Sequence, residues 1–262
     1  MSLDKQKIKS NFNRFSKNYN SLANLQKQVA QRLFEIARPE IQNSQNILDL
    51  GCGTGFITQN ILSEKEFAQK NIFQLDIAYN MLLQSNFAPN QHIFNINADI
   101  ENLPFKPGSF DLVLSSLALQ WVNDLDRVLT NIKEIAHQSK SAVVFSIFLD
   151  GTLTELEKSA RELNINLSIN NFIALNSLKR IIGANFNNYQ IEVQDFTLEH
   201  ENVLDLIHSI KHIGASYSNK KSGDILLKKH DFLELNKFYL KNFNNCGRIA
   251  SSWKVAYIKT SI

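Results

Sequence analysis

The sequence predicts an α/β fold in which an open, mostly parallel sheet carries helices on both faces. Four short apolar runs in the first 150 residues should form strands, and helices should follow the first two. The strands are expected at Ile47–Leu50, Ile72–Leu75, His92–Ile96 and Phe110–Leu114. Glycine, acidic or small polar residues follow these runs, and ligands bind in the crevice at the carboxyl ends of strands in such sheets.

The segment ILDLGCGTG, residues 47–55, joins the first strand to the first helix and indicates a binding site. Gly51, Gly53 and Gly55 leave the turn without side chains, so that a ligand can lie against the backbone. A dinucleotide loop of the G-x-G-x-x-G type needs a third glycine where this chain has Phe56, whose ring blocks the pyrophosphate path. The loop therefore favours a sulfonium cofactor with one amino-acid tail, S-adenosylmethionine.

Two acidic residues after the second and third strands are candidate contacts for the adenosine part of such a cofactor. Asp76, with Ile77 beside it, ends its strand where an acid can accept hydrogen bonds from both ribose hydroxyls. Its alternative role is the N-cap of a helix over 77–84. Asp99 could accept a hydrogen bond from the adenine amino group while Ile100 packs on the ring, although an isolated aspartate there would be a turn residue.

Taken together, LDLGCGTG, Asp76, ADIENLPF and FDLVLSSLALQW resemble the class I S-adenosylmethionine-dependent methyltransferases. The resemblance implies a Rossmann-like, seven-stranded sheet whose last strand is antiparallel, with S-adenosylhomocysteine as the product. It also implies that Asp49 contacts the methionine moiety through water. The full set of expected cofactor-binding residues is Arg14, Asp49, Gly51, Cys52, Gly53, Gly55, Asp76, Ile77, Asp99, Ile100 and Ser115.

Length and composition fit a cytoplasmic globular protein. The 262 residues are 44% hydrophobic, and no uncharged apolar run approaches the roughly twenty residues needed to cross a bilayer. The segment Met1–Lys9 lacks the apolar core of a secretory signal. Cys52 and Cys246 are far apart and belong to no metal-ligand motif, which argues against a disulfide and a metal site. The net charge of +3 does not indicate a nucleic-acid partner.

Segments outside the sheet should cover the binding site within a single domain, residues 1–262. Apolar residues at helical spacing in 5–37 predict one or two amphipathic helices ahead of the first strand. We assign an N-terminal helical cap to 1–40, the cofactor-binding core to 41–150, a helical segment with the sixth strand to 151–200, a helical lid to 201–247 and the last strand to 248–262.

Two details of the second half are expected from its pattern. The sixth strand is placed at Tyr189–Glu199 and the last at Trp253–Ile258, which would form the antiparallel edge of the sheet. Thr152 is a candidate N-cap for the helix that follows, with Glu155 as its partner in a capping box.

The outer segments resemble one branch of these methyltransferases. FNRFSKNYNSLANLQKQVAQRL, SLALQWVNDLDRVL, FLDGTLTELEKS and IKHIGAS are similar to the BioC family, the malonyl-acyl-carrier-protein O-methyltransferases of biotin synthesis, although 164–190 departs from any recognised pattern. This resemblance implies methylation of the free carboxylate of a malonyl thioester, which primes pimeloyl synthesis. Another small-molecule methyltransferase is an alternative, and SSLALQWVNDL also resembles mitochondrial complex I assembly factors.

Such chemistry needs positioning rather than a strong base, because a malonyl carboxylate is already ionised near neutral pH. We therefore expect no catalytic triad, and water exclusion should make the carboxylate more reactive. The candidates for substrate positioning are Tyr19, Gln120, Trp121, Lys211 and His212, and Arg14 could bind a carboxylate of either substrate or cofactor. The alternatives are a solvated charge for Arg14, core packing for the two aromatic residues and a polar helix end for the Lys-His pair.

The expected partner is malonyl-loaded acyl carrier protein or malonyl-coenzyme A, with no nucleic acid and no membrane. Two lysine pairs, Lys220 with Lys221 and Lys228 with Lys229, could offer a basic edge to an acidic carrier protein. Such pairs are also common on solvated surfaces.

Overall fold

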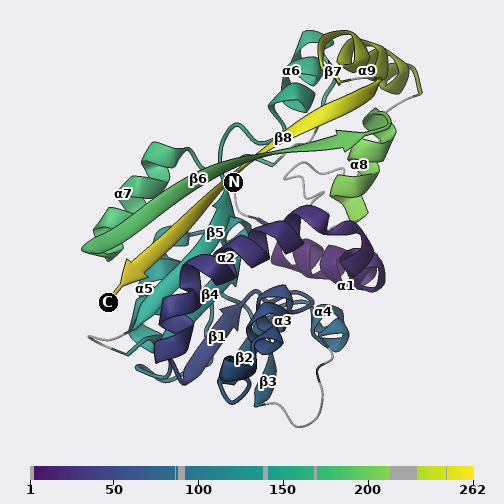
Figure 1. The fold of residues 1–262 in the computed structure, drawn as a ribbon. Coiled ribbons are helices and arrows are strands. Elements are labelled where there is room, and N and C mark those ends of the chain that lie inside the picture. The colour runs from purple at the N-terminus through teal and green to yellow at the C-terminus, as the bar shows by residue number, and fades with distance from the viewer. Residues whose placement is uncertain are drawn as a thin grey trace.

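A computed structural model describes residues 3–85, 87, 92–137, 141–167, 170–212, 229–245 and 247–262, with backbone alone at 212, 229 and 245. Its centre is a mixed sheet with the strand order β3-β2-β1-β4-β5-β8-β6 (Figure 1). The strands are β1 (Asn46–Leu50), β2 (Asn71–Asp76), β3 (Ile93–Asn97), β4 (Leu112–Ser116), β5 (Ala142–Phe148), β6 (Asn188–His200) and β8 (Arg248–Ser261), and the two-residue β7 (Asn244–Asn245) pairs with β8.

The strand order reverses at β1. This strand pairs in parallel with β2 on one side, where Leu48 faces Phe73, and with β4 on the other, where Leu48 faces Val113. Leu48 and its neighbours Ile47 and Leu50 are fully buried, as expected for a strand covered on both faces. The connections from β1 and β4 therefore leave in opposite directions and open a crevice between them.

The last long strand does not form the edge of the sheet, contrary to the sequence prediction. In β8, Ile258 faces Phe145 of β5 on one side and Ile191 of β6 on the other, and both pairings are antiparallel. Every residue of β8 from Val255 to Ile258 is at most 1% exposed, so this run needs a neighbour on each side. The edge is β6, whose exposed charged residues discourage pairing with another sheet.

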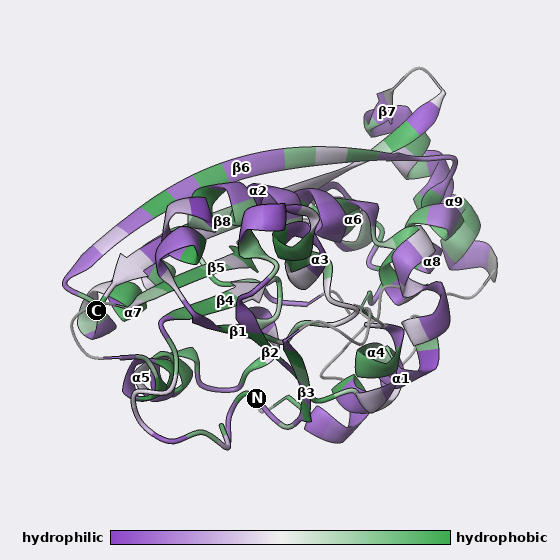
Figure 2. Cartoon of the chain, turned by 60° about the horizontal axis from the view of Figure 1, so that its bottom comes forward, coloured by the Kyte–Doolittle hydropathy of each residue, from purple (hydrophilic) through white to green (hydrophobic). Residues whose placement is uncertain are grey.

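Helices cover both faces of the sheet (Figure 2). They are α1 (Lys5–Leu22), α2 (Asn24–Asn43), α3 (Phe56–Ser63), α4 (Tyr79–Gln84), α5 (Leu125–Ile135), α6 (Thr154–Glu162), α7 (Leu175–Asn185), α8 (Val203–His212) and α9 (Lys229–Asn242), with short 3₁₀ turns at η1 (Lys65–Phe67) and η2 (Leu119–Trp121). Neighbouring residues of β5 point to opposite faces. Val144 belongs to the buried cluster that contains Leu33 of α2, and Val143 belongs to the cluster that contains Ile132 of α5.

The helices outside the core contact one another across the top of the sheet. Helix α1 contacts α4 and α8, and α9 contacts α6 and α8 (Figure 1). Within the described ranges, no helix is both long enough and apolar enough to span a membrane.

Local details differ from the expected pattern at α4 and α6. Helix α4 starts at Tyr79 with Ala78 as its N-cap, so Asp76 is not the capping residue. Helix α6 starts at Thr154, after Leu153 in a left-handed conformation. Thr152 Oγ1 instead accepts a hydrogen bond from the backbone N–H of Lys254 at 3.1 Å, so its hydroxyl joins the helix entrance to β8 rather than capping the helix.

Candidate active site

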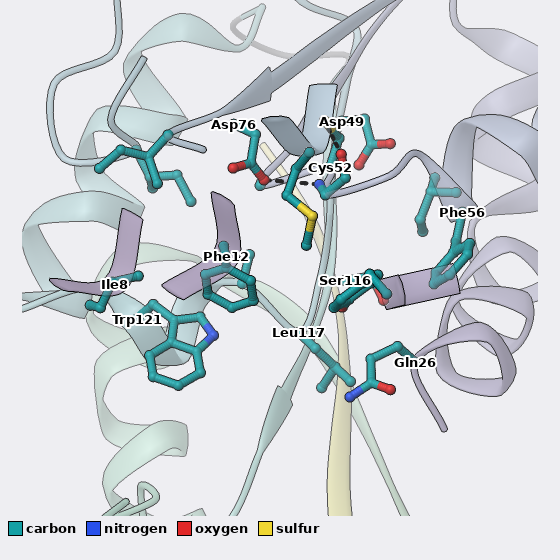
Figure 3. A pocket seen from close by; sticks show the side chains of 18 of the residues that line it. Ile8, Phe12, Gln26, Asp49, Cys52, Phe56, Asp76, Ser116, Leu117 and Trp121 are labelled. Carbon is teal, nitrogen blue, oxygen red and sulfur yellow. Dashed lines mark hydrogen bonds between the residues drawn. The ribbon is translucent and has the colours of Figure 1, made fainter. Parts of the chain in front are cut away.

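A cavity lies at the carboxyl ends of β1, β2 and β4, where the strand order reverses. Residues as far apart in sequence as Asp49 and Trp121 line it, because parallel strands bring their carboxyl ends to one edge of the sheet (Figure 3). Side chains from α1 and α2 complete the wall.

The glycine loop between β1 and α3 forms one wall of this cavity. Gly51 has φ +68°, and a Cβ there would lie 2.3 Å from Cβ of Ala118, another cavity residue. Gly53 has φ +57°, and a Cβ there would meet nothing within 4 Å. The first glycine is therefore required by close packing, whereas the second leaves open space above the backbone for a ligand.

Asp49, near the end of β1, lines the cavity. A series of buried, hydrogen-bonded polar side chains holds its carboxylate in place. Thr58 Oγ1 donates to Asp49 Oδ2 at 2.9 Å, Gln74 Nε2 donates to Thr58 Oγ1 at 2.8 Å, and Ser85 Oγ donates to Gln74 Oε1 at 2.7 Å. All four side chains are buried. Burial raises the pKa of Asp49 to about 7, against the opposing effect of the Thr58 hydrogen bonds.

Asp76, the last residue of β2, also lines the cavity and binds the loop directly. Its Oδ2 accepts from the backbone N–H of Gly53 at 2.9 Å and its Oδ1 from that of Ala78 at 2.7 Å. Burial raises the pKa of Asp76 to about 6. No cation forms an ion pair with Asp49 or Asp76 among the residues that the structure describes. The cavity thus presents two carboxylates that a positively charged ligand would stabilise.

Asp99 also lines the cavity, but it has a protein partner that the sequence did not indicate. Lys5 Nζ of α1 lies 3.2 Å from Asp99 Oδ1 and 2.8 Å from Glu101 Oε2. These side chains are only 20–25% exposed. The ion pairs join the first turn of α1 to the segment after β3 and close the cavity at that end.

Aromatic side chains from α1 meet residues of the core. The ring of Tyr19 stacks on Phe56 with centroids 6.0 Å apart, and that of Phe12 meets Trp121 edge-on at 5.7 Å. All four residues line the cavity. Burial, together with the nearby charge of Asp76, raises the pKa of the Tyr19 hydroxyl, which therefore remains a hydrogen-bond donor at neutral pH.

Several predicted residues lie in the cavity wall, and others do not. Gly51, Cys52, Gly53, Ile77 and Ile100 line it together with Asp49, Asp76, Asp99, Tyr19 and Trp121. Burial raises the pKa of the Cys52 thiol well above its ordinary value, so the thiol is protonated at neutral pH. Gly55, also expected at the cofactor, instead begins α3 as its N-cap and is not among the residues that line the cavity.

Arg14 is exposed on α1 and lies over the ring of Phe15, away from the cavity. Ser115 is buried and donates to the Leu50 carbonyl at 2.8 Å, whereas the next residue, Ser116, lines the cavity. The reason is that successive residues of a strand point to opposite faces, and the pattern did not show which serine faces the ligand.

Gln120 lies outside the wall, and its Nε2 donates to the Leu117 carbonyl at 2.6 Å. Lys211 is in α8, and no described residue of α8 or α9 lines the cavity. The side chain of His212 and those of the four lysines proposed for docking lie outside the described residues, as does Cys246.

The structure also brings in residues that sequence reasoning missed, notably Lys5, Phe12, Gln26, Ser116 and Leu117. The sequence could have indicated Gln26, because a polar residue at this position interrupts the apolar stripe of α2. No sequence pattern indicated Leu117, because its left-handed φ of +50° follows from the tertiary structure.

The arrangement fits S-adenosylmethionine. The space above Gly53 accommodates a ligand against the loop, and the buried carboxylates of Asp49 and Asp76 suit its positive charges. When bound, this cofactor supplies an electrophilic methyl group attached to a positively charged sulfur. None of the described residues that line the cavity is a histidine.

The chain is similar to a family of known proteins. A family model described as "Methyltransferase domain" matches residues 48–144. A malonyl-acyl-carrier-protein O-methyltransferase of Methylovorus is 29% identical over 97% of this chain and 88% of its own, and one of Ilyobacter polytropus is 30% identical over 93% and 89%. The mitochondrial arginine-hydroxylase NDUFAF5 of mouse is 32% identical over 88% of this chain and 66% of its own.

Solved structures with low sequence identity share the fold. A putative methyltransferase of Bacillus halodurans has a TM-score of 0.57 at 12% identity, with 88% of this chain and 96% of that one covered. An S-adenosylmethionine-dependent methyltransferase of Thermotoga maritima has a TM-score of 0.52 at 16% identity, with 96% and 99% covered. The chain therefore belongs to the S-adenosylmethionine-dependent methyltransferases, in the family that includes the malonyl-acyl-carrier-protein O-methyltransferases.

Proposed function

We propose that the protein methylates the free carboxylate of a malonyl thioester, with malonyl-loaded acyl carrier protein as the acceptor. The observation that carries this proposal is the extent of the match to relatives of that name, which takes in 93–97% of the chain. The match includes α1 and α2, whose side chains line the cavity beside the cofactor loop. The product would be a methyl ester that primes pimeloyl and biotin synthesis.

The walls of the cavity suit this chemistry. A carboxylate is ionised near neutral pH and needs no proton removed before it is methylated. Phe12, Phe56 and Trp121 surround the space with aromatic surface that excludes water, which makes a carboxylate more reactive. Holding the reacting groups in an attack geometry can contribute about 7–11 kcal/mol to the rate.

For the cofactor, we infer that Asp76 accepts hydrogen bonds from the ribose hydroxyls and that Asp99 accepts from the adenine amino group. Both carboxylates line the cavity on the side of the glycine loop and β3. The substitution Asp76→Ala should weaken S-adenosylmethionine binding in a calorimetric titration. An unchanged affinity would refute the ribose assignment.

The second candidate is action on a protein side chain. It is favoured by the 32% identity to the mouse arginine-hydroxylase, although this chain covers only 66% of that relative. Under this alternative, neither malonyl-loaded carrier protein nor malonyl-coenzyme A would be methylated.

Mass spectrometry separates the candidates. Purified malonyl-, succinyl- and unloaded acyl carrier protein, with malonyl-coenzyme A alongside, are incubated with the protein and S-adenosylmethionine. We expect one added methyl group on the malonyl-loaded carrier alone. If no acceptor gains a methyl group while the cofactor still binds, the malonyl proposal is wrong.

A further inference from the structure

Gln26 is a buried polar residue in the first turn of α2. The buried face of this helix is otherwise apolar and includes Leu25, Val29 and Ala30, and Gln26 is only 9% exposed. Gln26 and Ala30 lie one turn apart and both line the cavity. Among the described residues the Gln26 amide has no hydrogen-bond partner, and it is not one of the fully buried atoms, so it is open to a ligand in the cavity.

The surroundings of this amide suit an anion. In Figure 3, Gln26 lies beside Leu117 on the opposite side of the view from Asp49 and Asp76. The first turn of α2 carries no acidic residue and no side-chain cap, so no negatively charged side chain of that turn opposes an anion there. An anionic group would therefore be favoured at this end of the cavity rather than beside the two aspartates.

The cavity offers neutral donors for such an anion. Lys5 is the one cation among its described lining residues, and its ammonium is already paired with Asp99 and Glu101. The Tyr19 hydroxyl has no hydrogen-bond partner in the described part of the chain and, like the Gln26 amide, can donate to a carboxylate oxygen. A neutral donor leaves the carboxylate charge in place, so the carboxylate stays nucleophilic.

We propose that the Gln26 amide binds one oxygen of the methyl-accepting carboxylate and so leaves the other oxygen to attack. Methyl transfer forms a C–O bond and breaks the C–S bond of the donor, the electron pair stays on sulfur, and no proton moves. This inference rests on the proposed function and names the residue that recognises an aliphatic carboxylate acceptor. Gln26 is thus a substrate-binding residue.

Three variants test the assignment. Gln26→Leu keeps the size of the side chain and removes the donor, and it places an apolar residue on an apolar face. Gln26→Glu keeps the shape and adds a negative charge that repels a carboxylate. Gln28→Leu is the matched control, because Gln28 lies two residues further on in α2, exposed and outside the cavity.

The first measurement is binding. Malonyl-coenzyme A is titrated by calorimetry into each protein saturated with S-adenosylhomocysteine, a complex in which no methyl can be transferred. We expect the Kd to rise at least tenfold for Gln26→Leu and further for Gln26→Glu, and to stay within twofold for Gln28→Leu. The Kd for S-adenosylmethionine should stay within twofold in Gln26→Leu and Gln28→Leu, which shows that the fold and the cofactor site are intact.

The second measurement is the rate of methylation of malonyl-loaded carrier protein, where the Gln26 variants should raise KM as well. If Gln26→Leu and Gln28→Leu give the same Kd and KM as the unaltered protein while that protein methylates the carrier, the Gln26 assignment is wrong and the proposed function stands. If the unaltered protein neither binds malonyl-coenzyme A nor methylates the carrier, the proposed function fails and the assignment fails with it.

Discussion

Lowering the pH should weaken S-adenosylmethionine binding, chiefly because Asp49 becomes protonated. Burial raises the pKa of Asp49 from 3.8 to about 7 in the free protein, and that of Asp76 to about 6. A cationic ligand favours the charged carboxylate, so the pKa of each group should fall on binding and protons should be released. Affinity should therefore increase as the pH rises through these two values.

The size of the effect follows from the two pKa values. Between about pH 7.5 and about pH 5.5, protonation of Asp49 alone should raise the Kd about 25-fold, and protonation of Asp76 should add about fourfold. The unaltered protein should thus lose about 100-fold in affinity. Asp49→Asn, which can still accept the Thr58 hydrogen bond, should lose only about fourfold.

The assay is calorimetric titration across this pH range in buffers with different ionisation enthalpies, which counts the protons released. Near about pH 6.5 the unaltered protein should release about one proton and Asp49→Asn about 0.2. If the unaltered protein shows a Kd independent of pH, or if Asp49→Asn retains the full slope, the electrostatic account of this cavity is wrong.

Four further outcomes follow from the same structure. Without cofactor, the stability contributed by protonated Asp49 is lost as the pH rises from about 4 to about 7, so Asp49→Asn should raise the free energy of unfolding at about pH 8 by up to about 4 kcal/mol; an equal or lower free energy of unfolding in urea would contradict this. Gly53→Ala should weaken cofactor binding in calorimetry, whereas Gly247→Ala, also at positive φ with open space around it but outside the cavity, should not; equal losses would show that backbone strain alone is responsible. Lys5→Gln should speed cofactor dissociation about two- to fivefold in stopped-flow experiments, and an unchanged rate would show that the ion pairs do not help to close the cavity. Gln74→Leu should destabilise the protein by about 2–3 kcal/mol in urea, because it removes two buried hydrogen bonds and leaves the Ser85 hydroxyl without a partner, while Thr58 keeps its bond to Asp49; a loss below about 0.5 kcal/mol would show that the neighbouring side chains rearrange to replace the lost bonds.

The strands and the glycine loop were predictable because their signals are local. An apolar run that ends at Leu50 and continues into glycines specifies a buried strand and a tight turn within ten residues. The acids at the ends of β2 and β3 follow from the same rule, since parallel strands bring their carboxyl ends to one edge. Those local patterns placed Asp76 and Asp99 in the cavity wall without any knowledge of the strand order.

Other parts of the site depend on contacts between distant segments. The position of β8 between β5 and β6 results from pairing on both sides, and its own apolar sequence fits an edge or a centre alike until those neighbours are known. Arg14 and Gln26 show the same limit for helices. A helical period identifies an apolar face, but the packing of α1 and α2 over the cavity decided that Arg14 faces solvent and that Gln26 faces the ligand space.

The sequence by itself determined the cofactor class, the glycine loop at the cavity and the acids that line the cavity with it, because each is specified by neighbouring residues on one strand or turn. The tertiary structure alone decided how that site is enclosed. Lys5 reaches Asp99 across 94 positions, and Ser116 rather than Ser115 faces the cavity. These outcomes depend on the angles and register at which separate elements pack, and those are set by burial of apolar surface over the whole chain.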